Sequence, residues 1–202
     1  MGVTVFYKGV LKSPDLIDPL LDELKHLSEE LGWEFCPFSD TDLNLSGAAL
    51  QVHPEAESLN FYFNPQGRLV NIAEAIFRKE GRSNPAEDEI DALHLCWCKT
   101  QFAGPLVHKM VVELLVYLQE KYFTEMEITD EGGYYPDKDE KELLRRMQFL
   151  DAMIDAFGKM LETGEPPDDL PEAQKNSLRQ AHRQLLQMLK FFANNPYLKE
   201  TN

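Results

Sequence analysis

The sequence is poor in cysteine and in basic residues, and it has no long apolar run. Three cysteines among 202 residues are an odd number in a chain too large to need disulfide staples, which favours a reducing compartment. We therefore expect a cytoplasmic protein. No stretch reaches the roughly 18 consecutive apolar residues of a membrane-spanning helix, and the first residues do not resemble a secretion signal. We accordingly expect no membrane partner.

Basic residues are outnumbered by acidic ones, 20 against 35, which gives a formal net charge of -15 at pH 7. A charge of this sign repels the phosphate backbone of nucleic acids and anionic lipid surfaces. We therefore expect no nucleic-acid partner. A protein partner with a basic surface, or a small anionic ligand at a locally basic site, remains compatible with the charge. An ordinary solvated surface has the same composition, so the charge alone identifies no partner.

The chain also lacks the short motifs of common active sites: nucleophile elbow, P-loop, GxGxxG and HExxH are all absent. The nearest approach to a metal site is at His94, Cys96 and Cys98, which share one face if this segment is a strand. One residue between the cysteines is the wrong spacing for a zinc knuckle, and no second pair exists. We predict no metal and no cofactor. The cysteines are interpreted as small core side chains, with a distorted redox pair as the alternative.

Helical periodicity is strong in two segments of the first two thirds of the chain. Leucines recur every three or four residues from Leu16 to Leu31, and Gly32 follows where a helix would end. A second amphipathic segment begins at Gly104 and Pro105 and continues to about Tyr122. Both patterns predict helices that lie with one face on a core.

The remaining segments of the first two thirds read as strands. Residues 3–10 are rich in β-branched and aromatic side chains, and residues 33–102 contain short alternating runs broken by turn-forming residues. The clearest hairpin pairs 59–63 with 68–72 through a turn at 64–67. A further strand is predicted at 126–129. The fold class is therefore α+β, with an antiparallel sheet backed by two helices.

The last third of the sequence predicts a helical hairpin. Apolar stripes run through residues 143–161 and 178–192, and residues 164–169 turn the chain between them. We predict an α+β domain over 1–135 and a C-terminal helical hairpin over 137–196. The hairpin must bury its stripes on the sheet, on the first helices or on a second copy, so a homodimer is one of the predicted arrangements.

Strand alternation predicts one apolar sheet face toward the helices and one polar, aromatic face away from them. Tryptophan and tyrosine among hydrogen-bonding side chains are typical of recognition surfaces, although a solvated sheet face has a similar composition. Gly104 adds the start of a helix, whose free amides suit an anion. The residues predicted to bind a ligand are His53, Tyr62, Trp97, Lys99, Gln101 and Gly104.

Three residues are candidates for catalysis. His108 lies one turn into the helix that starts at Gly104, Glu131 lies in the following loop, and Lys99 precedes both. A histidine with a carboxylate is the minimum for acid–base chemistry. The glycine pair at 132–133 gives that loop backbone freedom, so it is interpreted as a lid, a tether or a plain connection.

Two functions are consistent with this sequence. The first is a non-catalytic binding module that uses the polar, aromatic sheet face or the loop at 132–133, for example to hold a basic protein. The alternative is an acid–base or hydrolytic enzyme that acts on a small anionic molecule. The absence of a catalytic motif favours the binding module.

Overall fold

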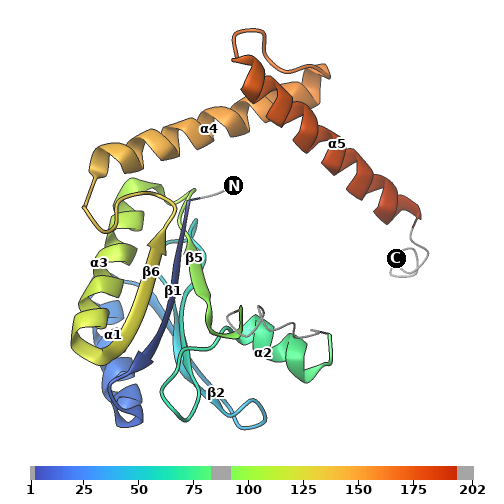
Figure 1. The fold of residues 1–202 in the computed structure, drawn as a ribbon. Coiled ribbons are helices and arrows are strands. Elements are labelled where there is room, and N and C mark those ends of the chain that lie inside the picture. Colours follow the sequence, from blue (N-terminus) through green and yellow to red (C-terminus); the bar gives the residue numbers. More distant parts are fainter. Residues whose placement is uncertain (1–2, 83–91, 195–202) are drawn as a thin grey trace. The chain divides into compact units, whose positions relative to one another are not determined.

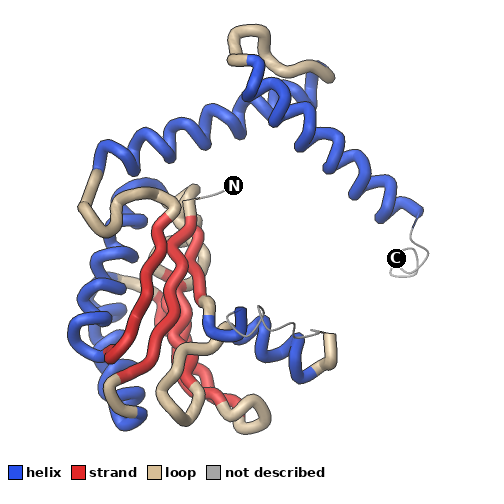
Figure 2. The backbone as a smooth tube through the Cα atoms, viewed as in Figure 1, coloured by secondary structure: helices blue, strands red, loops and turns tan. Residues whose placement is uncertain are grey.

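The computed structural model describes residues 3–82 and 92–194 (Figures 1 and 2). The chain divides into two compact units, residues 1–147 and 148–202. Within the described residues the fold is α+β, with five α-helices and six strands. The six strands form two three-stranded antiparallel sheets rather than the single sheet that the sequence predicted. No helix among the described residues is long and apolar enough to cross a membrane.

The first sheet has β1 at its centre. Strand β1 (Thr4–Leu11) pairs antiparallel with β5 (Cys96–Lys99) on one side and with β6 (Phe123–Asp130) on the other. Val5 and Tyr7 of β1 have no exposed surface, as expected for alternate residues that face a core. The centre of this sheet is therefore supplied by the first strand of the chain.

The second sheet has the order β2 (Glu34–Asp40), β3 (Leu45–Gln51), β4 (Leu59–Phe63). Gly47 of β3 lies directly against the β4 backbone, where a Cβ atom would come 2.0 Å from the Phe61 carbonyl oxygen. Only glycine fits at this point. The close approach keeps β3 and β4 tightly paired beneath the apolar side chains of the core.

A buried tyrosine joins the two sheets. The Tyr7 hydroxyl of β1 donates a hydrogen bond to the Asn60 carbonyl oxygen at 2.7 Å and accepts one from the Asn60 amide at 2.8 Å. Tyr7 is fully buried, so water cannot replace either bond. Burial, followed by the neighbouring Cys96 and Cys98, raises the pKa of Tyr7 well above its usual value, which keeps the hydroxyl protonated as a donor.

The segment after β4 also connects the sheets. The predicted turn at 64–67 is present, with Gly67 at a φ of 74°. The predicted strand at 68–72 is wrong, because this segment makes only isolated bridges, from Arg68 to Val10 of β1 and from Leu69 to Phe63 of β4. Pairing to both sheets in turn prevents it from forming a regular ladder with either.

Two helices cover one side of the sheets, as predicted. Helix α1 (Ile17–Leu31) lies against β2 and β3, whereas α3 (Gly104–Tyr122) lies against β6 and β1 (Figure 1). Helix α2 (Ile72–Lys79) lies on the other side of the strands. The Asn71 side chain caps α2 by accepting hydrogen bonds from the first free amides of the helix.

A polar cluster joins the two covering helices. The Glu23 carboxylate of α1 accepts hydrogen bonds from the hydroxyls of Tyr117 and Tyr122 and from Lys121 Nζ, the last at 2.7 Å. Burial alone would raise the pKa of Glu23, but the hydrogen bonds from Lys121 and the two tyrosines outweigh it and lower the pKa. The carboxylate therefore stays ionised where α1 meets α3.

The C-terminal helices form a hairpin, as predicted. Helix α4 (Glu140–Thr163) and helix α5 (Glu172–Asn194) contact each other through a small apolar cluster in the second unit. Ala156, Met160 and Leu178 are buried in this cluster. The last residues of the predicted hairpin, 195–196, lie outside the described part of the chain.

The bonds between Tyr7 and Asn60 can be tested by removing one oxygen atom. We expect Tyr7→Phe to lower the free energy of unfolding of the first unit by about 1–3 kcal/mol, because the Asn60 amide and carbonyl lose their partner. Both tryptophans lie in the first unit, so urea unfolding followed by tryptophan fluorescence reports this change. Tyr117→Phe is the matched control: its hydroxyl is exposed, so the loss should stay below about 1 kcal/mol. Equal losses in both variants would contradict the role of Tyr7.

Candidate functional site

Among the cavities formed by the described residues of the first unit, two are compared as candidate ligand sites. The larger has a volume of about 460 Å³ and lies around one end of β1 and β6. The smaller has a volume of about 310 Å³ and lies where β4 approaches β5. The two cavities differ in how many of their polar groups already bond to other groups of the protein.

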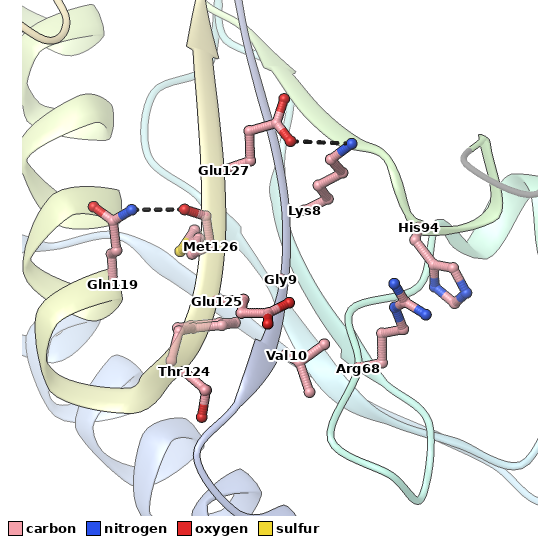
Figure 3. Close-up of a pocket in the computed structure, with 11 residues that line it drawn as sticks. Lys8, Gly9, Val10, Arg68, His94, Gln119, Thr124, Glu125, Met126 and Glu127 are labelled. Atoms are coloured by element: carbon pink, nitrogen blue, oxygen red, sulfur yellow. Dashed lines mark hydrogen bonds and ion pairs between the residues drawn. The ribbon is translucent and has the colours of Figure 1, made fainter.

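The larger cavity is lined by charged and polar residues, four of which already bond to other groups of the protein. Figure 3 shows Gln119 of α3 on one side of β6, with Arg68 and His94 beyond β1. Lys8 Nζ lies 3.1 Å from the Glu127 carboxylate. His94 Nδ1 lies 2.7 Å from the Leu69 carbonyl oxygen, and Gln119 donates to the Met126 carbonyl oxygen, also at 2.7 Å.

Sequence reasoning did not identify this cavity. Its opposed charges, Lys8 and Glu127, meet because β1 and β6 pair in that register. More than a hundred residues separate the two strands, so no local pattern signals their proximity. Because its aromatic lining residue, Phe123, is buried and its Lys8 and Glu127 already pair with each other, we regard the larger cavity as the weaker candidate.

The smaller cavity, which we call the Trp97 pocket, lies on the side of the strands that α1 and α3 leave uncovered. Leu59, Phe61 and Phe63 of β4 are fully buried, and the residues between them, Asn60 and Tyr62, point the other way. In β5 the same alternation buries Cys96 and Cys98 and leaves Trp97 41% exposed. The pocket is lined by Ala49, Glu57, Ser58, Asn60, Tyr62, Asn71, Ile72, Ala73, Cys96 and Trp97.

Three side chains of the Trp97 pocket have hydrogen-bonding groups to offer. Across the described ranges, the side-chain amide of Asn60, the Tyr62 hydroxyl and the Trp97 indole make no hydrogen bond with the protein; the bonds of Asn60 to Tyr7 come from its backbone. Burial, then the nearby Cys36 and Cys96 thiols, raise the pKa of Tyr62, so its hydroxyl remains a donor at neutral pH.

Hydrogen bonds and a ring contact hold the rim of the pocket in place. Asn71 Nδ2 donates to the Leu95 carbonyl oxygen at 3.0 Å while the Asn71 Oδ1 atom caps α2. Glu57 accepts the Lys99 backbone amide at 3.1 Å, and the Phe38 ring meets the Tyr62 ring edge-on with centroids 4.9 Å apart. Such a frame presents its unpaired groups in a preformed arrangement.

Of the six residues predicted to bind a ligand, Tyr62 and Trp97 line this pocket. The other four lie elsewhere. His53 Nδ1 accepts the Glu55 amide at 3.2 Å, and Lys99 Nζ lies 5.8 Å from the centroid of the Phe102 ring. Gln101 is buried in the turn after β5 rather than on a sheet face, and Gly104 begins α3 with a φ of 85°.

His108, the predicted catalytic histidine, lies in the core. Its Nδ1 is 2.7 Å from Thr100 Oγ1, and its Nε2 is 3.0 Å from Asp130 Oδ1, although this second contact is poorly aligned for a hydrogen bond. Neither His108 nor Thr100 has any exposed surface, and the Asp130 side chain is equally buried. The order hydroxyl, imidazole and carboxylate resembles that of hydrolytic sites, but this trio is closed to solvent.

Asp130 also holds the loop that follows it. Its Oδ1 accepts the Gly132 amide at 2.5 Å, and its Oδ2 accepts the amides of Tyr134 and Tyr135 at 2.7 and 2.9 Å. Burial would raise the pKa of Asp130, but the contact with His108 and these amides outweigh it and lower the pKa. The loop is thereby tied to an ionised, buried carboxylate.

Gly132 is required by packing. A Cβ atom at this position would lie 2.6 Å from His108 Nε2 and 2.8 Å from a Leu143 methyl group. The predicted reason for the glycine pair was backbone freedom. Contact with the imidazole is a second reason, and it becomes visible only when α3 and the loop are brought together.

The three catalytic candidates do not converge. No hydrogen bond or ion pair within residues 3–82 and 92–194 joins His108, Lys99 and Glu131. The Glu131 side chain is exposed, whereas its backbone amide donates to the Thr4 carbonyl oxygen at 3.0 Å.

The cysteines considered as metal ligands are buried, and burial raises the pKa of Cys96 and Cys98 to about 12. Both thiols are thus protonated at neutral pH. His94 belongs to a short 3-10 turn, Ala92–His94, rather than to the strand that was predicted to align it with them. In the part of the chain that the structure describes, no three His, Cys, Asp or Glu side chains are grouped so as to hold a metal ion.

Comparison with protein-family models, with curated proteins and with solved structures finds no match for this chain. Its function must therefore be inferred from the geometry of the molecule.

The buried carboxylate makes stability depend on pH. We expect Asp130→Asn to lower the free energy of unfolding by about 3 kcal/mol at pH 7, because the amide cannot accept all of the same hydrogen bonds. The folded-state pKa of Asp130 is below its unfolded value of 3.8. Its stabilisation is therefore complete above that value and is lost as the pH falls through the folded pKa.

Denaturant unfolding between pH 7 and pH 3 should show the difference between wild type and Asp130→Asn narrowing below about pH 4. Glu131→Gln removes the adjacent exposed carboxylate and is the control, which should follow wild type within about 0.5 kcal/mol. A difference that stays constant over the whole pH range would contradict the role given to the ionised carboxylate.

Proposed function

We propose that this chain is a non-catalytic binding protein that holds an extended segment of a protein partner at the Trp97 pocket. The observation that carries the proposal is the combination, in one preformed pocket, of an exposed tryptophan with unpaired groups of Asn60 and Tyr62. Exposed aromatic side chains next to hydrogen-bonding groups are enriched where proteins bind other proteins.

The size of the pocket favours a side chain over a whole cofactor. Its volume of about 310 Å³ lies at the lower end of the roughly 300–1,000 Å³ of small-molecule sites. One large side chain of a partner would fill it. The side-chain amide of Asn60 offers both a donor and an acceptor, which matches the main chain of an extended peptide.

The charge of the pocket favours a basic segment. Glu57 is the charged residue among its lining residues, and the whole chain has a net charge of -15. A lysine or arginine of the partner could lie over the exposed Trp97 ring while its charge faces Glu57. A small anionic ligand has less support, because no lysine or arginine is among the described residues that line the pocket.

The enzyme alternative also has less support. A general base must come within hydrogen-bond reach of its substrate, yet His108, Thr100 and the side chain of Asp130 are buried. The loop at 132–133, the other predicted binding surface, is tied to the same buried group. The sheet face therefore remains the better-supported working surface.

The proposal can be tested without a known partner by panning a random peptide library on the immobilised protein. We expect enriched peptides to contain lysine or arginine close to a large apolar side chain. Trp97→Ala should weaken the binding of a synthetic peptide at least about tenfold, since exposed tryptophans commonly dominate such contacts.

Phe102→Ala is the matched control, because Phe102 is an aromatic residue of the same unit that is 59% exposed and lies outside the pocket lining. It should leave the dissociation constant unchanged. Enriched peptides that bind wild type and Trp97→Ala equally well would rule out the Trp97 pocket as the binding site.

A further inference from the structure

The second unit buries few of its apolar side chains. Its described core consists of Ala156, Met160 and Leu178, with Met153, Phe157 and Leu170 packed around them. Two helices alone cannot enclose more than the seam between them, so amphipathic hairpins of this kind usually need further helices to cover their remaining apolar faces.

Helix α4 carries a second apolar stripe beside the one that contacts α5. Ile154 and Leu161 are seven residues apart and therefore lie on the same face of the helix. They are 44% and 48% exposed. Phe157 lies between them and is half-buried against the core cluster, so the exposed stripe is continuous with the buried one.

Helix α5 continues this apolar surface. Leu185 lies two turns beyond the buried Leu178 and is half-buried. Leu186 and Met188, which flank this line, are 43% and 56% exposed. The second unit thus has a broad apolar face that uses both helices.

The two helices of this unit have opposite charge. In the α4 portion of the unit three acidic residues accompany one basic residue, whereas in α5 four basic residues accompany one acidic residue. The acidic residues are Asp151, Asp155 and Glu162, and the basic residues of α5 are Lys175, Arg179, Arg183 and Lys190.

We propose that this apolar face is the contact between two copies of the chain, which associate through their second units as an antiparallel four-helix bundle. A two-fold axis would place the acidic α4 of each copy beside the basic α5 of the other copy. The same favourable pairing of opposite charges would then occur twice in the interface. Both exposed stripes would be covered at once.

The charge of the second unit argues against a membrane or a nucleic acid as the partner of the basic, amphipathic helix α5. A membrane or a nucleic acid would attract α5 but would repel the acidic α4 portion next to it and the chain as a whole, with its net charge of -15. A second copy of the chain would present a basic helix to α4 and an acidic helix to α5.

The test is the mass of the full-length protein in solution, measured by light scattering after size exclusion. We expect the measured mass to rise to twice the chain mass of 23.2 kDa as the protein concentration is raised to about 100 µM, as for an association of moderate affinity. Leu161→Asp should weaken association at least about tenfold. Leu106→Asp is the matched control: Leu106 is an exposed leucine of the first unit, 66% accessible, and its variant should remain dimeric.

A charge exchange tests the orientation. Asp151→Lys with Asp155→Lys in one chain, and Arg179→Glu with Arg183→Glu in another, should each weaken self-association. Mixing the two chains should restore a dimer, because every contact between α4 and α5 of opposite copies then has either two native or two reversed partners.

Three results would overturn the proposal. A wild-type chain that is monomeric throughout the range has no such contact. Dissociation by Leu106→Asp but not by Leu161→Asp would place the interface in the first unit. Failure of the mixed variants to pair, with each still helical, would exclude the antiparallel arrangement.

Discussion

The two hydrogen bonds of the Tyr7 hydroxyl are the contact on which the geometry of the first unit depends. Tyr7 is opposite Cys96 in the first sheet, and its hydroxyl holds the backbone of Asn60 in the second. This fixes the distance between β5 and β4. The side chains of Asn60 and Trp97, which point away from the core, then line the same pocket between the two sheets. The Trp97 pocket is therefore a consequence of how the sheets are joined, and its unpaired polar groups are presented by strands that cannot move apart without exposing a buried hydroxyl.

A second group of buried polar side chains resembles a catalytic site but has a structural role. Thr100, His108 and Asp130 are arranged as a hydroxyl, an imidazole and a carboxylate, yet the carboxylate is directed at the amides of the loop that follows β6. A buried charge is costly unless it is fully paired, and here the pairing specifies one conformation of the loop against α3. The exposed surface that carries aromatic and unpaired groups lies elsewhere, at the Trp97 pocket.

Local patterns predicted much of the fold and part of the candidate site. The helices that became α1, α3, α4 and α5 follow from apolar spacing, and the outward direction of Tyr62 and Trp97 follows from alternation along single strands. Gln101 was assigned to the sheet face by the same rule, but β5 ends at Lys99 and the chain turns inward. Alternation holds only while a strand continues, and strand ends are set by pairing with distant segments.

Periodicity alone specifies which residues of this chain face a core, because the helix and the strand each repeat over a few residues. It does not specify partners. The division into two sheets depends on contacts such as Tyr7 with Asn60 and Val10 with Arg68, which are more than fifty residues apart in the chain. The need for glycine at position 132 likewise arises from an imidazole on another element. Only the tertiary structure settled these features, since each is a contact between segments whose own sequences are compatible with several neighbours.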